Sequence, residues 1–507
     1  MTLHAATPTT ASRPGGESVT GGFRAAAGAF WWEGVYLGAT RVIQLVRFII
    51  LARLLSPHDF GLLAVAWTVV EVGQGLSEWG LWNALVQRPH VSEHEYNAAW
   101  TFDFLRCTTL TTVIGVLAPS IAVAFAEPSA TNLIRALGLT PVMYALGSIK
   151  RIDLHRRLEF RSLTFIRLPE MAVEAVIAIV LAPRIGVWAL AVAALISISF
   201  TVALSYMLAP HRPRFIVDWK VAVSLFRFSR WLTLTSITLF VGEATLRAVI
   251  SRRLGTESLG VYYLVMRLAT LPLGTVSQVV WTVGFSLHAR LQADVRRAEA
   301  AFQYVLTSMS ALVLPVYALL FVLADALTVH VLGPRWSGST DLIRILALAN
   351  VAAIGTVAIR PMVEGRGYPR YASALIGANQ ALVILNAYVI APWAGIVGIA
   401  WGRTIIEFAL LPAWMWAAKQ VLPDAFRGIG KIMLAAGLSA ILAALAALAV
   451  VNATGSPWGA LIAALIGAGI TVVTLLALDH SLQLGFVANV KKALPTLFTP
   501  RRGYADK

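Results

Sequence analysis

Residues 53–61 read Arg-Leu-Leu-Ser-Pro-His-Asp-Phe-Gly, and residues 252–260 read Arg-Arg-Leu-Gly-Thr-Glu-Ser-Leu-Gly. At an offset of 199 residues, the two stretches share an arginine, a leucine, a small residue, an apolar residue and a glycine at identical spacing. Each stretch joins the first and second apolar segments of a block of six. Because six is even, both blocks enter a membrane in the same orientation, related by an axis along the membrane normal. The repeat therefore predicts a two-lobed bundle in which a substrate binds between the halves.

The composition is typical of a membrane protein. Of 507 residues, 58% are hydrophobic and 13% are charged, whereas soluble domains carry about 25% charged residues. The net charge of +16 fits basic loops on one side of a membrane, and it does not predict nucleic-acid binding, because the basic residues are not gathered in a soluble domain. The single cysteine, Cys107, excludes an intrachain disulfide, and no metal-ligand cluster is apparent.

A helix needs about 20 apolar residues to cross the hydrocarbon core. This length predicts an all-α polytopic fold with fourteen spans. They lie near residues 28–52, 60–87, 98–124, 131–149, 163–182, 186–209, 231–250, 259–289, 304–332, 341–362, 371–391, 395–418, 432–451 and 456–478. The predicted domains are a disordered cytoplasmic tail (1–27), an N-lobe (28–210), a C-lobe (211–420), a final helix pair (421–480) and a second cytoplasmic tail (481–507). The final pair lacks charged residues from Ile432 through Leu478, so we expect it at the periphery, facing lipid.

The distribution of basic residues supports this count. With an even number of spans and both termini inside, the inside segments hold 26 Lys and Arg and the outside loops hold five. Such an excess on the cytoplasmic side is the usual bias of membrane proteins. The charges therefore predict a multi-pass protein with both ends in the cytoplasm.

The ten other arginines lie inside or beside the predicted spans. They are Arg41, Arg47, Arg106, Arg135, Arg167, Arg247, Arg267, Arg344, Arg360 and Arg403. An arginine at the bilayer centre costs about 2.5–3.5 kcal/mol on insertion scales. Such side chains normally face a protein interior or a wet cavity, where an anion or a carboxylate compensates them. Ten of them predict a large cavity that accepts a negatively charged ligand.

Three of these arginines are the leading candidates for anion binding. Arg41 and Arg47 lie in the first span, and Arg267 lies in the second span of the other half. A guanidinium binds a phosphate through charge-assisted, bidentate hydrogen bonds. The alternative is an internal ion pair, for which Glu33, Glu71 and Glu78 are the available partners.

Further arginines have carboxylates at helical spacing. Arg247 follows Glu243 by four residues, and Arg403 precedes Glu407 by four. These spacings predict ion pairs on one helix face, which lower the cost of burial. Arg360 adjoins Pro361 near the inside end of a span, where we expect either snorkelling to the interface or a role at the inside mouth.

Three acids are candidates for ion coupling. Glu170 and Glu174 share one face of the fifth span, and Glu78 lies in the second. A buried carboxylate without a partner tends to bind a proton. The sequence therefore allows H+ or Na+ coupling, and it equally allows drive by the membrane potential, which is worth about 2.3 kcal/mol per charge per 100 mV. No other cofactor is expected.

The stretch Ile50-Leu-Ala-Arg-Leu-Leu-Ser-Pro-His-Asp-Phe-Gly-Leu-Leu-Ala, followed by Gly80-Leu-Trp-Asn-Ala-Leu-Val-Gln-Arg, resembles the Wzx-type oligosaccharide flippases. These belong to the multidrug/oligosaccharidyl-lipid/polysaccharide superfamily, and the likeness is to the exopolysaccharide branch. The resemblance implies a V-shaped bundle of twelve spans plus two in a bacterial inner membrane. It also implies alternating-access export of polyprenyl-pyrophosphate-linked oligosaccharide from the cytoplasmic to the outer leaflet. From their positions in the predicted spans, the candidate arginines for the pyrophosphate are Arg41, Arg47, Arg267, Arg247, Arg403 and Arg360.

Three other function classes are alternatives, and one of them, a scaffold without transport activity, leaves the arginines inside the spans unexplained. The main alternative is a multidrug or organic-cation antiporter, since one scaffold hosts different cargo. The span acids are nearly as numerous as the span arginines, so charge alone argues only weakly against a cation. An enzyme is not expected, because the predicted loops are too short for a catalytic domain. Expected partners are the lipid-linked oligosaccharide, membrane lipids and the polysaccharide polymerase machinery.

Overall fold

The computed structural model describes residues 19–77, 85, 91–157, 159–218, 238–454 and 457–481, and within these ranges the chain forms helices joined by turns, with no strand. Eight of the described helices are long and apolar enough to cross a membrane. The predicted all-α polytopic fold is confirmed. The count of fourteen spans stays a prediction, as do the domain boundaries.

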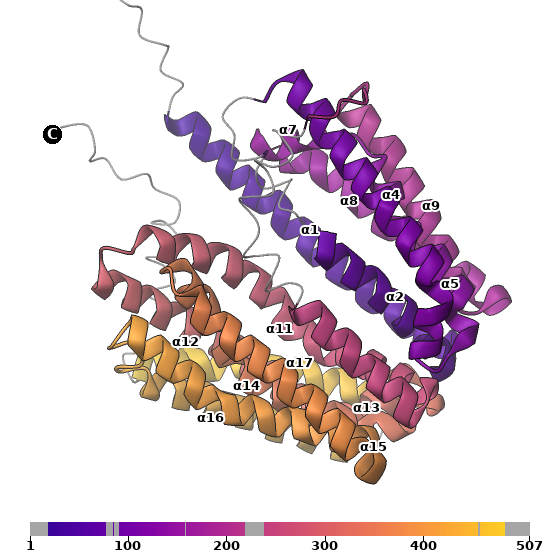
Figure 1. Ribbon diagram of the computed structural model, residues 1–507. Helices are drawn as coiled ribbons and strands as arrows, with labels where there is room; N and C mark the ends of the chain where they lie inside the picture. Colours follow the sequence, from indigo (N-terminus) through magenta and orange to yellow (C-terminus); the bar gives the residue numbers. More distant parts are fainter. Residues whose placement is uncertain are drawn as a thin grey trace, which may run out of the picture.

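The first half of the chain forms the lobe in the upper right of Figure 1. Its helices are α1 (Val19–Leu54), α2 (Pro57–Ser77), α4 (Glu93–Ala124), η1 (Pro128–Ala130), α5 (Thr131–Leu137), α6 (Thr140–Ala145), α7 (Arg151–Arg156), α8 (Phe160–Ile185) and α9 (Trp188–Leu208). Helix α1 begins at Val19, within the segment 1–27 that the sequence predicts as a tail. The alanines at 25–27 favour helix, and residues 1–18 lie outside the described ranges.

The second half forms the lower lobe (Figure 1). After a helix over 238–254 come α11 (Thr256–Arg290), α12 (Val295–Val322), α13 (Ala324–Ala326), η2 (Leu327–Leu332), η3 (Pro334–Ser339), α14 (Thr340–Gly365), α15 (Pro369–Val421), α16 (Gly430–Thr454) and α17 (Pro457–Ser481). A straight helix of 53 residues would be about 80 Å long. The non-helical φ of 57° at Gly395 divides α15 into two helices, at the point where the sequence predicts a break between spans.

The predicted span over 131–149 is not one helix. It consists of the short helices α5 and α6, with Gly138 at the end of the first and Pro141 in the first turn of the second. Proline lacks the backbone N–H of a regular helix, and its ring clashes with the carbonyl four residues earlier. Pro141 therefore interrupts the helix that the apolar pattern alone predicts.

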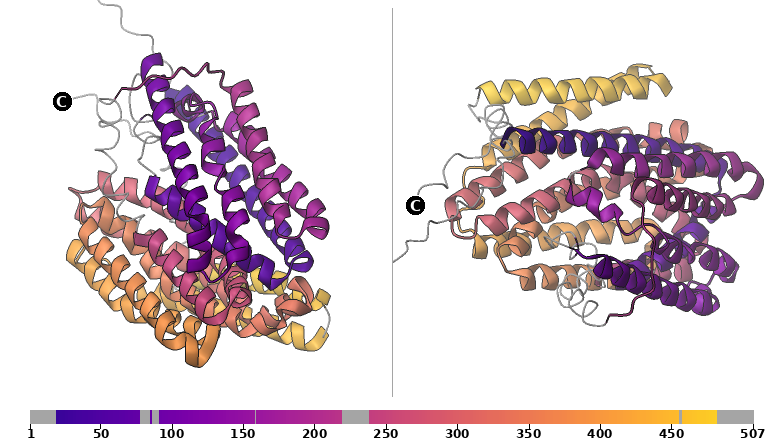
Figure 2. Two further views of the ribbon diagram at one scale, coloured as in Figure 1. Left: turned by 45° about the vertical axis from the view of Figure 1, so that its right-hand side comes forward. Right: turned by 90° about the horizontal axis from the view of Figure 1, so that it is seen from above.

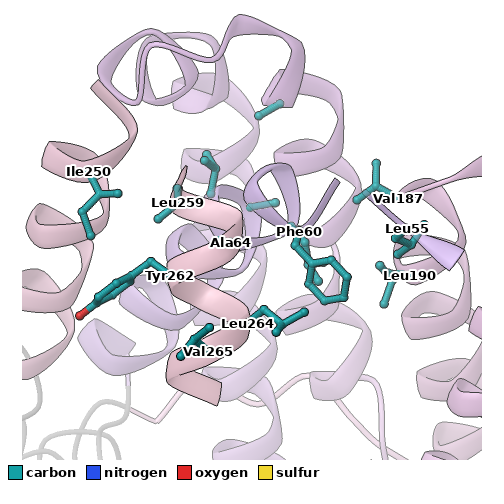
Figure 3. Close-up of a cluster of buried hydrophobic side chains, with 14 of the residues drawn as sticks. Leu55, Phe60, Ala64, Val187, Leu190, Ile250, Leu259, Tyr262, Leu264 and Val265 are labelled. Atoms are coloured by element: carbon teal, nitrogen blue, oxygen red, sulfur yellow. The ribbon is translucent and has the colours of Figure 1, made fainter. Parts of the chain in front are cut away.

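The two lobes meet at one end of the molecule and separate toward the other (Figure 1). The closed end is defined here by the α1–α2 connection at residues 55–56 and by residue 255, which joins the 238–254 helix to α11. Its core is shared by both lobes: Phe60 and Ala64 of α2 pack with Leu259 and Leu264 of α11 in one buried cluster (Figure 3). The opposite end is called the open end.

The repeated sequences make the central contact of the closed end. Helix α2 begins at a Ser56 cap, whose hydroxyl accepts the Asp59 amide at 3.2 Å. One turn later α2 crosses α11 through the matched glycines: a Cβ on Gly61 would lie 2.0 Å from the Thr256 carbonyl oxygen, and a Cβ on Gly260 would lie 1.8 Å from that of Pro57. Only glycine permits this approach, so the spacing of the repeat reflects a backbone contact about a pseudo-twofold axis.

Hydrogen bonds across the closed end follow the same symmetry. Arg53 Nε donates to the Val331 carbonyl at 2.8 Å, and its repeat partner Arg252 donates to the Ala124 carbonyl at 3.4 Å. Ser251 Oγ donates to the Phe125 carbonyl at 2.6 Å. In the other direction, the buried Trp336 donates from Nε1 to the carbonyl of Ala52 at 2.7 Å. The first lobe therefore binds the segment that follows α12 of the second lobe, and the second lobe binds the segment at the end of α4 of the first.

A second pair of matching stretches supports the symmetry. Residues 131–137 read Thr-Asn-Leu-Ile-Arg-Ala-Leu, and residues 340–346 read Thr-Asp-Leu-Ile-Arg-Ile-Leu. They begin α5 and α14, and their arginines act alike. Arg135 donates to the Gly115 carbonyl, and Arg344 donates to that of Phe321. Both arginines therefore stabilise helix packing and do not face the space between the lobes.

The final helix pair packs on the outside of the second lobe. Helix α16 contacts α12, and α17 contacts α16; α17 lies at the edge of the molecule in the right-hand view of Figure 2. Leu434 and Leu465 are 70% and 67% exposed. Exposed leucines on these two apolar helices favour contact with lipid, as the uncharged sequence predicts.

Glu127 gives the closed end a dependence on pH. It accepts a hydrogen bond from Thr256 Oγ1 of the other lobe at 2.6 Å, and His58 lies 3.4 Å away. Burial raises the pKa of Glu127, but hydrogen bonds from Ser129 and Thr256 and the adjacent His58 outweigh burial, so the pKa lies below its ordinary value. The resulting stabilisation is complete above about pH 4.3 and is lost as the pH falls through the lower, folded-state pKa.

We therefore expect the Tm of Glu127→Gln to fall less steeply than that of the parent between about pH 6 and pH 3. Thermal unfolding in detergent measures this. Glu257→Gln removes a nearby exposed carboxylate and serves as the control. Parallel curves for the parent and Glu127→Gln would contradict the assignment.

Candidate functional site: an arginine cluster between the lobes

Arg247 is the charged residue that joins the two lobes below the closed end. It lies on the 238–254 helix, and its Nη1 donates to Thr68 Oγ1 at 2.7 Å and to Glu71 Oε2 at 2.9 Å, both on α2. The direct ion pair of Arg247 is with Glu71 of α2, while Glu243, the partner predicted from the sequence, is a second nearby carboxylate. The Arg247 side chain is 16% exposed, so the ion pair is largely shielded from solvent.

Tyr263 of α11 lies at the centre of a group of charges. The Arg247 guanidinium stands 5.6 Å from the centre of its ring. The charged side chains around its hydroxyl are those of Arg267, Glu71, Arg247 and Arg47. We call Arg47, Glu71, Arg247, Tyr263 and Arg267 the interlobe cluster. It draws on α1, α2, the 238–254 helix and α11, and therefore on both lobes.

The three arginines of the interlobe cluster differ in their partners. Arg47 lies 2.5 Å from Glu174 of α8, and Arg247 is paired with Glu71. Arg267 is exposed and makes no ion pair within the described ranges. Arg47 and Arg247 are each paired with a carboxylate, Glu174 and Glu71, so the excess positive charge of the cluster comes from Arg267. The exposed Arg267 is the side chain most available to an incoming anion.

Arg41 lies on α1, nearer the open end, and faces the second lobe. It lines a cavity of about 330 Å³ together with Thr275 of α11 and Leu312 of α12. Its Nη1 donates to Gln44 Oε1 at 3.2 Å, while its buried Nε has no hydrogen-bond partner in the described part of the chain. A buried guanidinium N–H without an acceptor is costly, so the described part of the chain leaves this side chain with unused hydrogen-bonding capacity.

Arg403 is held inside the second lobe. Its Nη1 donates to Glu243 Oε1 and to the hydroxyl of Tyr262, both at 3.3 Å. Glu407, the partner predicted from the sequence, is also close to Arg403, but its direct hydrogen bond is from Asn379. Arg403 is therefore neutralised by neighbours from other helices, and we assign it to the packing of α15.

Arg360 lies away from the interlobe cluster. It pairs with Glu364 one turn later at 2.9 Å, and Glu364 also accepts from Trp281 Nε1 at 3.4 Å. Trp281 is 14 residues after Arg267 on α11, or about 21 Å along the helix. The structure therefore places Arg360 toward the open end and separates it from the anion site.

The predicted coupling acids have different surroundings. Glu174 is paired with Arg47, and Glu170 accepts a hydrogen bond from the hydroxyl of Tyr144 on α6. Glu78 lies outside the described residues, and the side chain of Glu33 is likewise not described. Of the two coupling candidates that the structure describes, Glu170 is the one that accepts a hydrogen bond from a neutral donor.

Residues 50–341 match the family described as polysaccharide biosynthesis protein. The chain belongs to this family. The succinoglycan biosynthesis transport protein ExoT of Rhizobium meliloti (strain 1021) is 26% identical over 337 residues, which cover 66% of this chain and 68% of that protein. The lipopolysaccharide biosynthesis protein WzxC of Escherichia coli (strain K12) is 23% identical over 399 residues, covering 76% and 79%. The resemblance to Wzx-type flippases is thus confirmed.

Solved structures show the fold of this polysaccharide biosynthesis protein. The lipid II flippase MurJ in an inward closed conformation matches with a TM-score of 0.72 and 13% identity, covering 89% of this chain and 99% of that one. An inward-facing multidrug resistance MATE family transporter of the MOP superfamily matches with a TM-score of 0.63 and 16% identity, covering 77% and 96%. The chain therefore has the two-lobed helical fold of the MOP superfamily.

Sequence reasoning missed Thr68, Tyr262 and Tyr263 in this member of the polysaccharide biosynthesis protein family. Tyr263 precedes Arg267 by four residues, a spacing that places both on one helix face. That signal was present in the sequence. The contact between Thr68 and Arg247 spans 179 residues and left no local signal.

Proposed function

We propose that the chain is a flippase that moves polyprenyl-pyrophosphate-linked oligosaccharide from the cytoplasmic to the outer leaflet of a bacterial inner membrane. The observation that carries the proposal is the excess of positive charge between the lobes, with Arg267 exposed and Arg41 Nε without an acceptor. A pyrophosphate supplies several acceptor oxygens to such guanidinium groups. The names and functions of the family and its relatives supply the sugar-linked lipid as the cargo.

The orientation follows from the basic residues. The closed end carries Arg53, Arg184, Arg252, Arg253 and Arg335, the five residues of the predicted outside loops. The excess of the remaining Lys and Arg belongs to the open end, which we therefore assign to the cytoplasm together with both termini. The head group enters from the cytoplasm, binds the interlobe cluster and leaves when the closed end opens.

The lipid tail has a separate path. Val42, Leu45 and Val46 of α1 are 62%, 41% and 48% exposed, and Leu312 of α12 is 60% exposed. These apolar side chains flank the cavity that contains Arg41. The polyprenyl chain would remain in the membrane beside α1 while the charged head group lies between the lobes. A cytoplasmic entry of this kind suits a transporter and requires no catalytic group.

The flippase test measures the outer-leaflet exposure of polyprenyl-pyrophosphate oligosaccharide in vesicles. Arg41→Ala with Arg267→Ala is expected to reduce exposure about 30-fold, since each lost charged hydrogen bond is worth about 1 kcal/mol or more. Arg135→Ala removes an arginine from helix packing and should retain most activity. Normal exposure in the folded double variant would make both arginines structural. If the intact chain moves no lipid-linked sugar, the organic-cation antiporter becomes the leading alternative.

The energy source stays a prediction with two alternatives. Proton or sodium coupling would use Glu170, because Arg47 already neutralises Glu174. Drive by the membrane potential needs no titrating residue. Collapsing the ion gradient and the potential separately in the same vesicles distinguishes them. A contact with polysaccharide polymerase machinery likewise stays a prediction.

A further inference from the structure

A basic pocket of about 700 Å³ lies at the open end of the first lobe. Its polar lining includes Glu93, Asn97, Lys150, His211, Arg212 and Arg214. These residues come from the first turns of α4, the connection before α7 and the segment after α9. None of the described residues that line the pocket belongs to α1, α2 or α11, so the pocket is separate from the interlobe cluster.

The segment over residues 211–218 is fixed along α4 by hydrogen bonds. The Arg214 amide donates to Asn97 Oδ1 at 2.8 Å, and the Ile216 amide donates to Thr101 Oγ1 at 3.0 Å. The pocket wall is therefore held by its backbone. The Arg212 and Arg214 side chains are not needed for that attachment.

The pocket has an excess of positive charge. Lys150 lies 2.5 Å from Glu93, while Arg212 and Arg214 are exposed and make no ion pair within the described ranges. His211 behind them is 8% exposed, and its Nε2 has no hydrogen-bond partner in the described part of the chain. Burial, and then the neighbouring Lys150, lower the pKa of His211, so its imidazole is neutral at pH 7. Two guanidinium groups therefore remain uncompensated.

Apolar side chains flank this charge. Met207, Phe215 and Val217 are 76%, 66% and 60% exposed. Phe215 also packs edge-on against Trp100, with ring centroids 5.2 Å apart. Aromatic residues beside basic ones are typical of the membrane–water interface. A soluble anion would contact the basic side chains alone, whereas an amphiphile would contact the basic and the apolar side chains together.

We propose that this pocket binds the head group of an anionic phospholipid from the leaflet at the open end, with its acyl chains against Met207 and Phe215. Basic pockets between membrane helices on the cytoplasmic side bind anionic head groups by the same chemistry. The assignment to the cytoplasmic leaflet rests on the proposed orientation. The recognition of a phosphate-bearing lipid rests on the pocket itself.

The test uses the full chain in detergent and measures retention of phosphatidylglycerol by native mass spectrometry. Arg212→Gln with Arg214→Gln should weaken this binding about tenfold or more. Arg290→Gln with Arg296→Gln removes two exposed arginines from the same end of the other lobe and should change binding less than about twofold. Binding to the parent should also weaken as salt is raised, which tests the proposal even if the double variant does not fold.

Three outcomes would overturn the proposal. Equal retention by the parent and the Arg212/Arg214 variant would place the lipid elsewhere. Equal retention of phosphatidylcholine would indicate ordinary contact with bulk lipid. Displacement of phosphatidylglycerol by millimolar inorganic phosphate would identify a site for a soluble anion. The assay does not measure flipping, so its result is independent of the flippase test.

Discussion

Replacing Gly260 by alanine is expected to hold the closed end apart and to reduce flipping strongly. The new Cβ would lie 1.8 Å from the Pro57 carbonyl oxygen and 2.7 Å from the Gly61 amide nitrogen. Both obstacles are backbone atoms, so the helices α2 and α11 themselves have to separate. Overpacking costs about 1–3 kcal/mol, and each 1.4 kcal/mol changes a population ratio about tenfold.

A cysteine at Val65 reports the state of the closed end, because Val65 is 0% exposed. In a Cys107→Ser background, an impermeant maleimide added from outside should label V65C slowly in the parent. Adding Gly260→Ala should raise the labelling rate about tenfold or more. Gly274→Ala lies on the same helix with nothing within 4 Å of its Cβ and should leave labelling and flipping unchanged. Equal rates for the two alanine variants would show that the glycine crossing does not keep this end shut.

Arg247→Ala is expected to abolish flipping and to lower the stability of the chain. Removing one partner of a buried ion pair costs about 3–5 kcal/mol. The Glu71 side chain is 33% exposed, and solvent screening reduces the expected loss to about 1–3 kcal/mol. The loss of transport has a second cause, because the interlobe cluster then lacks a cation that an anionic head group needs.

A second substitution separates these two causes. Glu71→Gln in the Arg247→Ala background removes the unpaired carboxylate and should restore most of the Tm. Flipping should stay low, since the cation is still absent. Measuring Tm in detergent and leaflet exposure in vesicles for all four combinations gives the coupling between the two residues. Recovery of flipping in the double variant would limit Arg247 to a structural role.

The sequence predicts helices and repeats better than it predicts charged partners. The repeat at Arg53–Gly61 is visible in the sequence because both copies have the same length. Its matched glycines mark the place where α2 crosses α11. The match between residues 131–137 and 340–346 was missed because the offset there rises to 209 residues. The longer connection of the second half, which contains α13, η2 and η3, accounts for this change.

Ion-pair partners depend on which helix faces pack together. Spacing along one helix suggested Glu243 for Arg247 and Glu407 for Arg403. In the structure Arg247 forms its ion pair with Glu71, and Arg403 forms its ion pair with Glu243, because each guanidinium reaches a neighbouring helix. Such choices arise from tertiary packing, for which hydropathy and local spacing carry no information. The excess of arginine was predictable, whereas the division between anion-binding and packing roles was not.

The paired contacts of the closed end have a consequence for membrane leakage. Arg53 and Arg252 each bind the opposite lobe at related positions, and the two glycines interlock about the same axis. Rotation of one lobe therefore disturbs both halves of the barrier at once, so opening is cooperative and half-open forms are sparsely populated. A carrier for a lipid-linked oligosaccharide must open widely. An all-or-none barrier lets it do so without a persistent narrow channel through which ions would dissipate the gradients of the cell.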